Sequence, residues 1–462
     1  MFKDFRQSAP PAPRAAPATP PPAPAPRPAM AIVPPPAADT GWHDLKQDMH
    51  DAILSQMNLA IIDQVDRAEL KREIGALVSP LLKQRGTALG ADRFRQLLSE
   101  LMDEVLGLGP LENLLSDPTV SDILVNGPDK IFVERRGLLE RSPLRFRDEK
   151  HLLRIIDKIV SRVGRRIDES QPWVDARLED GSRVNAIIRP CAIDGPSLSI
   201  RKFSADKLTL DKLVDFGALS DTAATFLSAC VQARLNVLIS GGTGSGKTTM
   251  LNAMSGFIDH RQRIVTIEDA AELQLQQDHV VRLETRPANA EGSGQISQRE
   301  LVKNALRMRP DRIVIGEVRG SEAFDMLQAM NTGHDGSMTT IHANTARDAI
   351  SRLEQMVVMI GADFPLSAVR SQIAAGINIV VQLNRLADGS RRVMSISEVT
   401  GQENGVVLMQ DIFAFRKSGL DAEGRVTGQF GPTGIRPKAM ALLDAAGHGL
   451  PVGTFTKPGT GA

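Results

Sequence analysis

An eight-residue glycine-rich motif constrains the chain more than any other feature. Residues 241–248 read Gly-Gly-Thr-Gly-Ser-Gly-Lys-Thr, follow the apolar run 236–240 and lead into residues 249–254, which suit a helix. This is a complete phosphate-loop pattern in the strand–loop–helix setting that it requires. The motif predicts an α/β fold around these residues and a site for a nucleoside triphosphate.

Each residue type in the motif has a physical reason. Glycines let successive backbone N–H groups turn inward around a β-phosphate at the start of a helix. The Lys247 ammonium can reach the β- and γ-phosphates, and the Thr248 hydroxyl can ligate Mg²⁺. The expected nucleotide-binding residues are Gly241, Gly242, Thr243, Gly244, Ser245, Gly246, Lys247, Thr248 and Thr249.

Composition narrows the classes of partner. The 462 residues carry 55 basic and 55 acidic side chains, only 4% are aromatic, and tyrosine is absent. The chain therefore has neither a generally basic surface nor many stacking platforms, and we expect no nucleic-acid partner. Cys191 and Cys230 lack metal-ligand spacing and are typical of a reducing compartment. With no apolar run near 18 residues and no signal peptide, we expect a cytoplasmic chain without direct transmembrane insertion.

The first hundred residues divide into two regions. Residues 9–38 are dominated by proline and alanine and cannot bury enough apolar area to fold. We expect an extended tail that acts as a tether, with docking to a partner as the alternative. Apolar side chains at three- and four-residue spacing then predict a small helical bundle. They are Trp42, Leu45, Met49, Ile53 and Met57, and then Phe94, Leu97, Leu98, Leu101, Met102 and Val105.

Short strand candidates and turn signals follow residues 107–110 and predict a separate α+β domain. Its expected strands are 122–125, 130–134, 183–188 and 197–200, with a helix near 150–163. Beyond Leu208, strands alternate with helices, as in a mostly parallel, helix-covered sheet, and 383–400 suggests a terminal hairpin. The expected divisions are a disordered Pro/Ala-rich tail (1–40), a helical bundle (41–106), an α+β domain (107–205), a phosphate-loop domain (206–446) and a flexible C-terminal tail (447–462).

Two further apolar strands end in carboxylates, which a phosphate loop needs to hold metal and activate water. The run 312–319 contains Glu317, and the run 263–269 ends in Glu268-Asp269. We expect Glu317 to be the general base or water orienter and a metal ligand beside Thr248, although Gly316 stands where Asp is common. Glu268 is the second candidate catalytic acid. For each alone, a helix cap or solvated turn is an equal alternative.

A third strand-like element, residues 333–344, carries two histidines. We expect His342 to sense the γ-phosphate by hydrogen bonding a phosphate oxygen or Glu317. A structural role is the alternative for a single histidine. Metal binding by this element is not expected because no cysteine or third histidine accompanies the pair at ligand spacing.

The phosphate loop, the two acidic strand ends and the histidine-containing element, taken in this order, resemble the motifs of the secretion-system traffic ATPase superfamily. Its members drive type II secretion, type IV secretion and type IV pili. The phosphate loop, 267–269, 316–319 and 340–344 correspond to its Walker A, Asp, Walker B and His boxes. Upstream segments are similar to the CpaF-like ATPases of tight-adherence (Tad) pili, and the resemblance covers about 107–443. Those segments are 108–112, 122–127, 174–185 and 194–203.

The resemblance implies a RecA-like P-loop ATPase domain preceded by a small PAS-like α+β domain. It implies a homohexamer that hydrolyses ATP with Mg²⁺ at subunit interfaces. Arg177, Arg183 and Arg201 match segments whose arginines close over the phosphates in this family. Residues 203–210 would be the hinge, and the stroke would pass to an inner-membrane platform protein, which places the chain peripherally at that membrane.

Three other functions compete with a hexameric motor for pilus assembly or protein secretion. A conjugation-type translocase would bind nucleic acid, which the balanced charge disfavours. A nucleotide-gated scaffold would not hydrolyse ATP, which the intact Lys247, Thr248 and Glu317 disfavour. A GTPase would need a guanine-reading Asn/Thr-Lys-x-Asp motif, and none is evident in a usable position after the phosphate loop.

Overall fold

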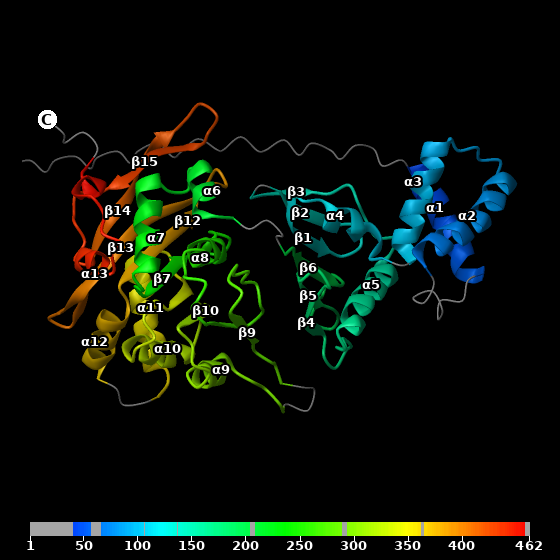
Figure 1. Ribbon diagram of the computed structural model, residues 1–462. Helices are drawn as coiled ribbons and strands as arrows, with labels where there is room; N and C mark the ends of the chain where they lie inside the picture. Colours follow the sequence, from blue (N-terminus) through cyan, green and yellow to red (C-terminus); the bar gives the residue numbers. More distant parts are fainter. Residues whose placement is uncertain are drawn as a thin grey trace, which may run out of the picture.

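The protein is described by a computed structural model that covers residues 40–56, 66–105, 107–135, 137–203, 208–288, 293–361 and 365–457. Three parts follow one another along the chain: a group of helices, a six-stranded sheet and a nine-stranded sheet (Figure 1). Nearly all of the expected Pro/Ala tail lies outside the described residues, as does Met57. In the described part, no helix is both long and apolar enough to cross a membrane.

The N-terminal part consists of α1 (Thr40–Gln56), α2 (Arg67–Gln84) and α3 (Ala91–Val105). Asp66 begins α2, because its carboxylate accepts the N–H of Ala68 and satisfies a free donor of the first turn. The three helices bury one shared apolar cluster, which confirms the helical periodicity in this region. Its members are Leu45, Met49, Ile53, Leu70, Ile74, Val78, Leu82, Leu97, Leu98, Leu101 and Met102.

The second part is an antiparallel sheet in the order β3-β2-β1-β6-β5-β4, with α5 (Glu149–Arg162) packed on it. The predicted helix and the four predicted strands are confirmed, whereas two further strands, β3 and β4, were not predicted. The remaining elements are η2 (Gly109–Leu111), α4 (Glu112–Ser116), β1 (Val120–Asn126), β2 (Ile131–Arg135), β3 (Leu138–Arg141), β4 (Trp173–Arg177), β5 (Arg183–Ile187) and β6 (Ser197–Arg201).

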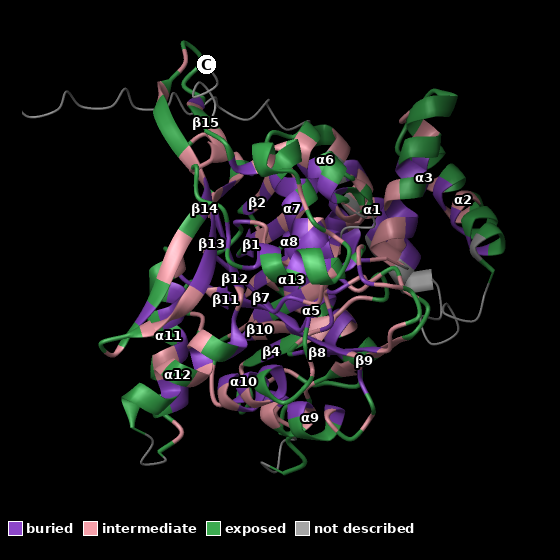
Figure 2. Ribbon diagram, turned by 60° about the vertical axis from the view of Figure 1, so that its left-hand side comes forward, coloured by how far each residue is buried: buried purple, intermediate pink, exposed green. Residues whose placement is uncertain are grey.

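The third part is a mixed sheet whose parallel section has the order β12-β7-β11-β10-β8-β9. These strands are β7 (Val237–Gly241), β8 (Ile264–Glu268), β9 (Val280–Glu284), β10 (Arg312–Val318), β11 (Met338–His342) and β12 (Ile379–Arg385). Helices cover both faces, as parallel sheets require (Figure 2). They are α6 (Leu210–Asp215), α7 (Asp221–Gln232), α8 (Lys247–Ser255), α9 (Gln298–Ala305), α10 (Glu322–Asn331), α11 (Ala346–Val358) and α12 (Leu366–Gly376).

The sheet continues beyond the expected terminal hairpin. After β12 the chain pairs antiparallel through β13 (Arg391–Glu403), β14 (Val406–Leu420) and β15 (Val426–Pro432). The prediction that strands and helices alternate as far as Leu443 is therefore wrong for this stretch. Strands β13 and β14 are the longest strands of the sheet and contain many exposed or half-buried residues. Their sequence therefore lacks the continuous apolar run that is typical of a buried strand.

The expectation of a flexible tail from residue 447 is corrected for residues up to 457. After α13 (Met440–Ala445), a short helix, η3 (Val452–Phe455), places Phe455 in the core at 3% exposure. Its ring lies 5.7 Å from that of Phe226 and 6.1 Å from that of Phe413. The sequence did not predict the burial of Phe455, because a single aromatic residue among glycines and prolines has no hydrophobic periodicity.

One buried arginine, Arg312, connects segments at the amino ends of the parallel strands. Arg312 is 1% exposed, and its guanidinium donates to Gln262 Oε1, to the Gly336 carbonyl and to the Val231 carbonyl, at 2.7, 3.0 and 2.8 Å. Gly336 has φ +83°, and a Cβ there would lie 2.0 Å from Arg312 Nη1. Only glycine therefore admits the guanidinium at this position.

We predict that Gly336→Ala lowers the free energy of unfolding by about 3 kcal/mol, because a methyl group would displace the buried guanidinium as well as strain the backbone. Urea titration measures the loss. Gly333→Ala is the matched control, since Gly333 also has a left-handed φ of +93° but open space around its Cβ. It should cost about 1 kcal/mol. Equal losses in the two variants would contradict the steric role of Gly336.

Candidate functional site

The phosphate loop lies at the carboxyl edge of the parallel strands, between β7 and α8. Gly244 and Gly246 have φ angles of +67° and +96°, which side chains disfavour. Gly241 is needed for space, because a Cβ there would lie 2.6 Å from the Leu383 carbonyl oxygen of the neighbouring strand. The loop therefore needs glycine for conformation at two positions and for close packing at a third.

Lys247 places its ammonium at the mouth of the loop. Its Nζ donates to the carbonyl oxygens of Gly241 and Gly242, both at 3.1 Å, and lies 3.9 Å from Glu317 Oε1. Burial lowers the pKa of Lys247, while the Glu317 carboxylate acts in the opposite direction. The nearby carboxylate supports the charged form of the lysine that phosphate binding needs.

Glu317 lies on β10 at an irregularity in the strand pairing. The pairing of β10 with β11 slips between Ile315 and Val318, so one extra residue is accommodated there. The Thr340 hydroxyl donates to the Gly316 carbonyl at 2.7 Å and holds this irregularity in place. Such bulges redirect side chains and are common beside active sites. The irregularity accompanies the exposure of the Glu317 carboxylate beside Lys247.

Arg319 is a site residue whose role the sequence analysis did not assign. It donates to Glu317 Oε2 through Nη2 at 2.7 Å and Nε at 3.0 Å, and its Nη1 donates to Asp269 Oδ2 at 2.8 Å. It thereby joins the ends of β8 and β10. A signal was available, because Arg319 follows Glu317 by only two residues and carries the opposite charge.

The Glu268 side chain packs directly against Gly316, the residue at a position where aspartate was expected. A Cβ on Gly316 would lie 2.9 Å from Glu268 Cγ, so the Glu268 side chain fills the space of a residue-316 side chain. Glu268 is 3% exposed, and its Oε2 accepts the N–H groups of Glu272 and Leu273 at 2.7 and 2.8 Å. Its Oε1 is buried and has no hydrogen-bond partner among the described residues. Burial raises the pKa of Glu268 to about 6 despite those two backbone bonds.

His342 ends β11 at the same edge of the sheet. Burial lowers its pKa, as does the charge of Lys247, whereas Glu317 acts to raise it. The neutral ring that results can donate one hydrogen bond and accept another. Among the described residues, no cluster of three or more histidine, cysteine or acidic side chains is arranged to hold a metal ion.

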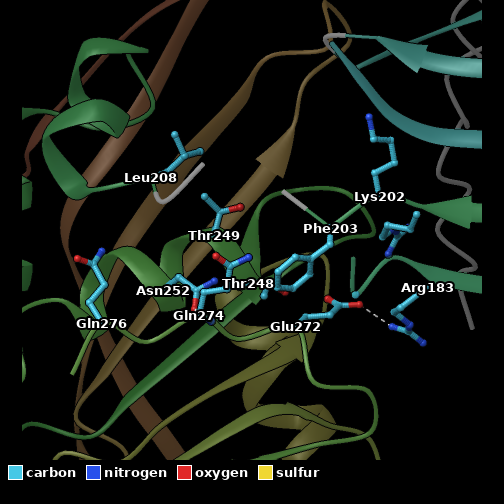
Figure 3. A pocket seen from close by; sticks show the side chains of 12 residues that line it. Arg183, Lys202, Phe203, Leu208, Thr248, Thr249, Asn252, Glu272, Gln274 and Gln276 are labelled. Carbon is cyan, nitrogen blue, oxygen red and sulfur yellow. Dashed lines mark hydrogen bonds and ion pairs between the residues drawn. The ribbon is translucent and has the colours of Figure 1, made fainter. Parts of the chain in front are cut away.

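A cavity of about 210 Å³ lies between the two sheet domains beside the start of α8 (Figure 3). Arg183 and Arg201 of the α+β domain line it together with Thr248 and Thr249. The lining is completed by Gly181, Lys202, Phe203, Leu208, Asn252, Glu272, Gln274 and Gln276. The described ends of the expected hinge, Phe203 and Leu208, border this cavity, whereas residues 204–207 lie outside the described residues.

The three arginines expected at the phosphates lie in two places. Arg183 donates to Glu272 Oε1 at 2.7 Å, and Arg201 donates to Asp122 Oδ1 at 3.1 Å, both beside the cavity. Arg177 does not line it and is paired with Glu284 on β9 at 3.3 Å. Thus Arg183 and Arg201 lie at the cavity beside Thr248 and Thr249, whereas Arg177 lies farther along the domain interface.

The raised pKa of Glu268 predicts a pH-dependent stability. The folded carboxyl group binds its proton more tightly than the unfolded one, so stability falls as pH rises from 4.5 to about 6 and stays reduced above that range. Glu268→Gln cannot ionise and keeps an oxygen for the two N–H groups. It should be more stable than the wild type above pH 6 by up to about 2 kcal/mol. Urea titrations above pH 6 and near pH 4.5 measure this gain, and an equal gain at both would contradict it.

Comparison with known proteins places this site in a family. Residues 104–427 match the family model described as Type II/IV secretion system protein. A Mycobacterium tuberculosis H37Rv protein that bears the name of a conjugal transfer protein is 41% identical over 315 residues, covering 67% of this chain and 89% of that protein. The type IV secretion system protein PtlH of Bordetella pertussis is 36% identical over 315 residues, covering 62% and 91%.

The solved structures of similar proteins include the VirB11 ATPase of the Brucella suis type IV secretion system. It is 28% identical, covers 62% of this chain and 94% of its own, and gives a TM-score of 0.35. The family match spans well over half of the chain, and it contains the phosphate loop, Glu268, Glu317 and His342. The chain therefore belongs to the Type II/IV secretion system protein family.

Proposed function

We propose that this protein is an ATP-hydrolysing motor that works as a homohexamer and powers pilus assembly or protein secretion through domain movement. One observation carries the proposal: the phosphate loop and the Glu317 carboxylate share one sheet edge, while arginines of a second domain line the adjoining cavity. Nucleotide held there would contact both domains at once. Its hydrolysis would therefore change the force between them.

The side chains divide the proposed chemistry among them. The loop N–H groups and Lys247 would bind the β- and γ-phosphates, and Glu317 would orient or deprotonate the attacking water. Thr248 and Glu317 would hold Mg²⁺, which supplies charge neutralisation at the phosphates when it is bound. His342, in its neutral form, would hydrogen bond the γ-phosphate. Glu268, whose pKa is raised to about 6, would serve as the second acid at this edge.

Arg319 would hold Glu317 ready in the state described here. Its guanidinium occupies Glu317 Oε2, while Oε1 remains directed toward Lys247. In the proposed motor, approach of a γ-phosphate would compete with Glu317 for both cations. The carboxylate would then be released toward the water it must activate.

The finer assignments rest on sequence resemblance and strand order. The parallel order β12-β7-β11-β10-β8-β9 with the loop after β7 supports a RecA-like ATPase domain, and we assign the α+β domain to the PAS-like class. The upstream segments support closeness to CpaF-like Tad pilus ATPases. An inner-membrane platform protein would receive the stroke and hold the cytoplasmic motor at the membrane.

A second candidate is a translocating ATPase of a conjugation-type system that acts on nucleic acid. The relative named for conjugal transfer favours it, whereas the balanced charge of 55 basic and 55 acidic residues does not. ATPase activity that rises with added DNA and binding that weakens steeply with salt would select this candidate.

We predict that Glu317→Gln lowers kcat by about 100-fold or more while leaving the affinity for ATP nearly unchanged, because the amide keeps an oxygen for Mg²⁺ but cannot accept a proton from water. Phosphate release and binding of a fluorescent ATP analogue measure the two quantities. Glu354→Gln is the control, since Glu354 is a similarly enclosed carboxylate that pairs with Arg370 away from the loop. Unchanged turnover in Glu317→Gln would remove Glu317 from its proposed role.

The arginines offer a second matched comparison. Arg183 and Arg177 each pair with a glutamate of the ATPase domain, yet only Arg183 lines the cavity. We predict that Arg183→Ala lowers kcat/KM for ATP by about 10- to 100-fold, the value of a hydrogen bond to a charged group. Arg177→Ala should stay within about twofold, as for an exposed ion pair. Steady-state kinetics measure both, and a larger loss in Arg177→Ala would reverse the assignment.

A further inference from the structure

A single carboxylate of the α+β domain lies between two arginines of the ATPase domain, outside the cavity described above. Glu134, on β2, accepts a hydrogen bond from Arg391 Nη2 at 3.2 Å and one from Arg385 Nη1 at 3.3 Å. Its side chain is only 13% exposed. The two arginines pair across β12 and β13 next to the turn that joins these strands, so one carboxylate balances two adjacent cations.

Arg391 also contacts the phosphate loop. Its Nε donates to the carbonyl oxygen of Gly244 at 2.8 Å. A Cβ on Gly244 would lie 3.5 Å from Arg385 Nη1, and one on Gly246 would lie 3.7 Å from Arg391 Cδ. Both arginines therefore pack against the two left-handed glycines that give the loop its shape.

The bond to Gly244 acts on the direction of a phosphate-binding donor. In a trans peptide, the C=O of one residue and the N–H of the next point to opposite sides. A donor that holds the Gly244 carbonyl outward thus turns the N–H of Ser245 inward. That N–H points into the loop, where it makes a long hydrogen bond of 3.4 Å to the Gly242 carbonyl. Inward N–H groups are what a phosphate loop offers to its ligand.

We infer that Arg391 is a positioning residue for the phosphate loop and that Glu134 sets its orientation, so that the α+β domain controls the affinity of the loop for nucleotide. The inference rests on the proposed ATP binding at this loop. The contacts run from Glu134 through Arg391 to Gly244 and cross from one domain to the other. Separation of the domains removes the carboxylate from Arg391 and frees the Gly244 peptide to rotate.

The test is a double-mutant cycle on the full chain, with the dissociation constant of a fluorescent ATP analogue in Mg²⁺ as the readout. Arg391→Ala should weaken binding about fivefold, which corresponds to about 1 kcal/mol. Glu134→Gln should weaken binding in the same direction. The double variant should be no weaker than Arg391→Ala, because the carboxylate acts through that arginine. The kcat at saturating ATP should stay within about twofold, since neither group touches the reacting atoms.

Arg385→Ala is the matched control. Among the described residues, Arg385 donates to the same carboxylate and makes no hydrogen bond to the loop, so its removal should change the dissociation constant by less than about twofold. Circular dichroism verifies folding. Should Glu134→Gln fail to fold, Glu134→Asp takes its place, because the shorter carboxylate falls short of Arg391 and should give the same loss.

Two outcomes overturn the inference: full affinity in Glu134→Gln, or losses that simply add in the double variant. In either case, wild-type binding that Lys247→Ala abolishes leaves the proposed nucleotide site intact. Failure of the wild type itself to bind ATP removes the proposed function instead. The two failures are therefore distinguishable in one set of titrations.

Discussion

The site depends on the burial of β7 between two parallel neighbours. Each residue of β7 is buried, and the strand pairs with β11 on one side and β12 on the other. Its backbone N–H and C=O groups are hydrogen-bonded to these two strands, so β7 cannot shift without breaking both sets of hydrogen bonds. The phosphate loop begins where β7 ends, and its position is therefore fixed by the sheet. Because β8, β10 and β11 run in the same direction, their acidic and histidine ends converge on that loop.

Electrostatic balance is the second feature of the site. Three cations near the cavity and loop each have a carboxylate partner: Lys247 with Glu317, Arg183 with Glu272 and Arg201 with Asp122. Such pairs on partly exposed side chains contribute little to stability. Exchange of the carboxylates for phosphate oxygens therefore costs little. A site built this way can open and close around a highly charged ligand without large changes in stability.

Two carboxylates near the same edge differ because their surroundings differ. Glu317 is partly exposed and lies beside Arg319 and Lys247. Glu268 is enclosed against Gly316, and burial raises the pKa of Glu268 to about 6. Opposite environments of this kind separate the roles of two similar acids. The missing side chain of Gly316 leaves the room that the buried Glu268 side chain occupies.

The residue pattern alone determined the phosphate loop, the acidic strand ends and the alternation of helices with strands as far as β12, because these depend on local spacing and short-range backbone needs. It also indicated the separate α+β domain. Tertiary structure alone decided that Arg183 and Arg201, but not Arg177, line the cavity, that Phe455 returns to the core, and that Glu134 meets Arg391. These contacts join residues far apart in the chain. No local pattern encodes them, since they arise only when separately folded surfaces meet.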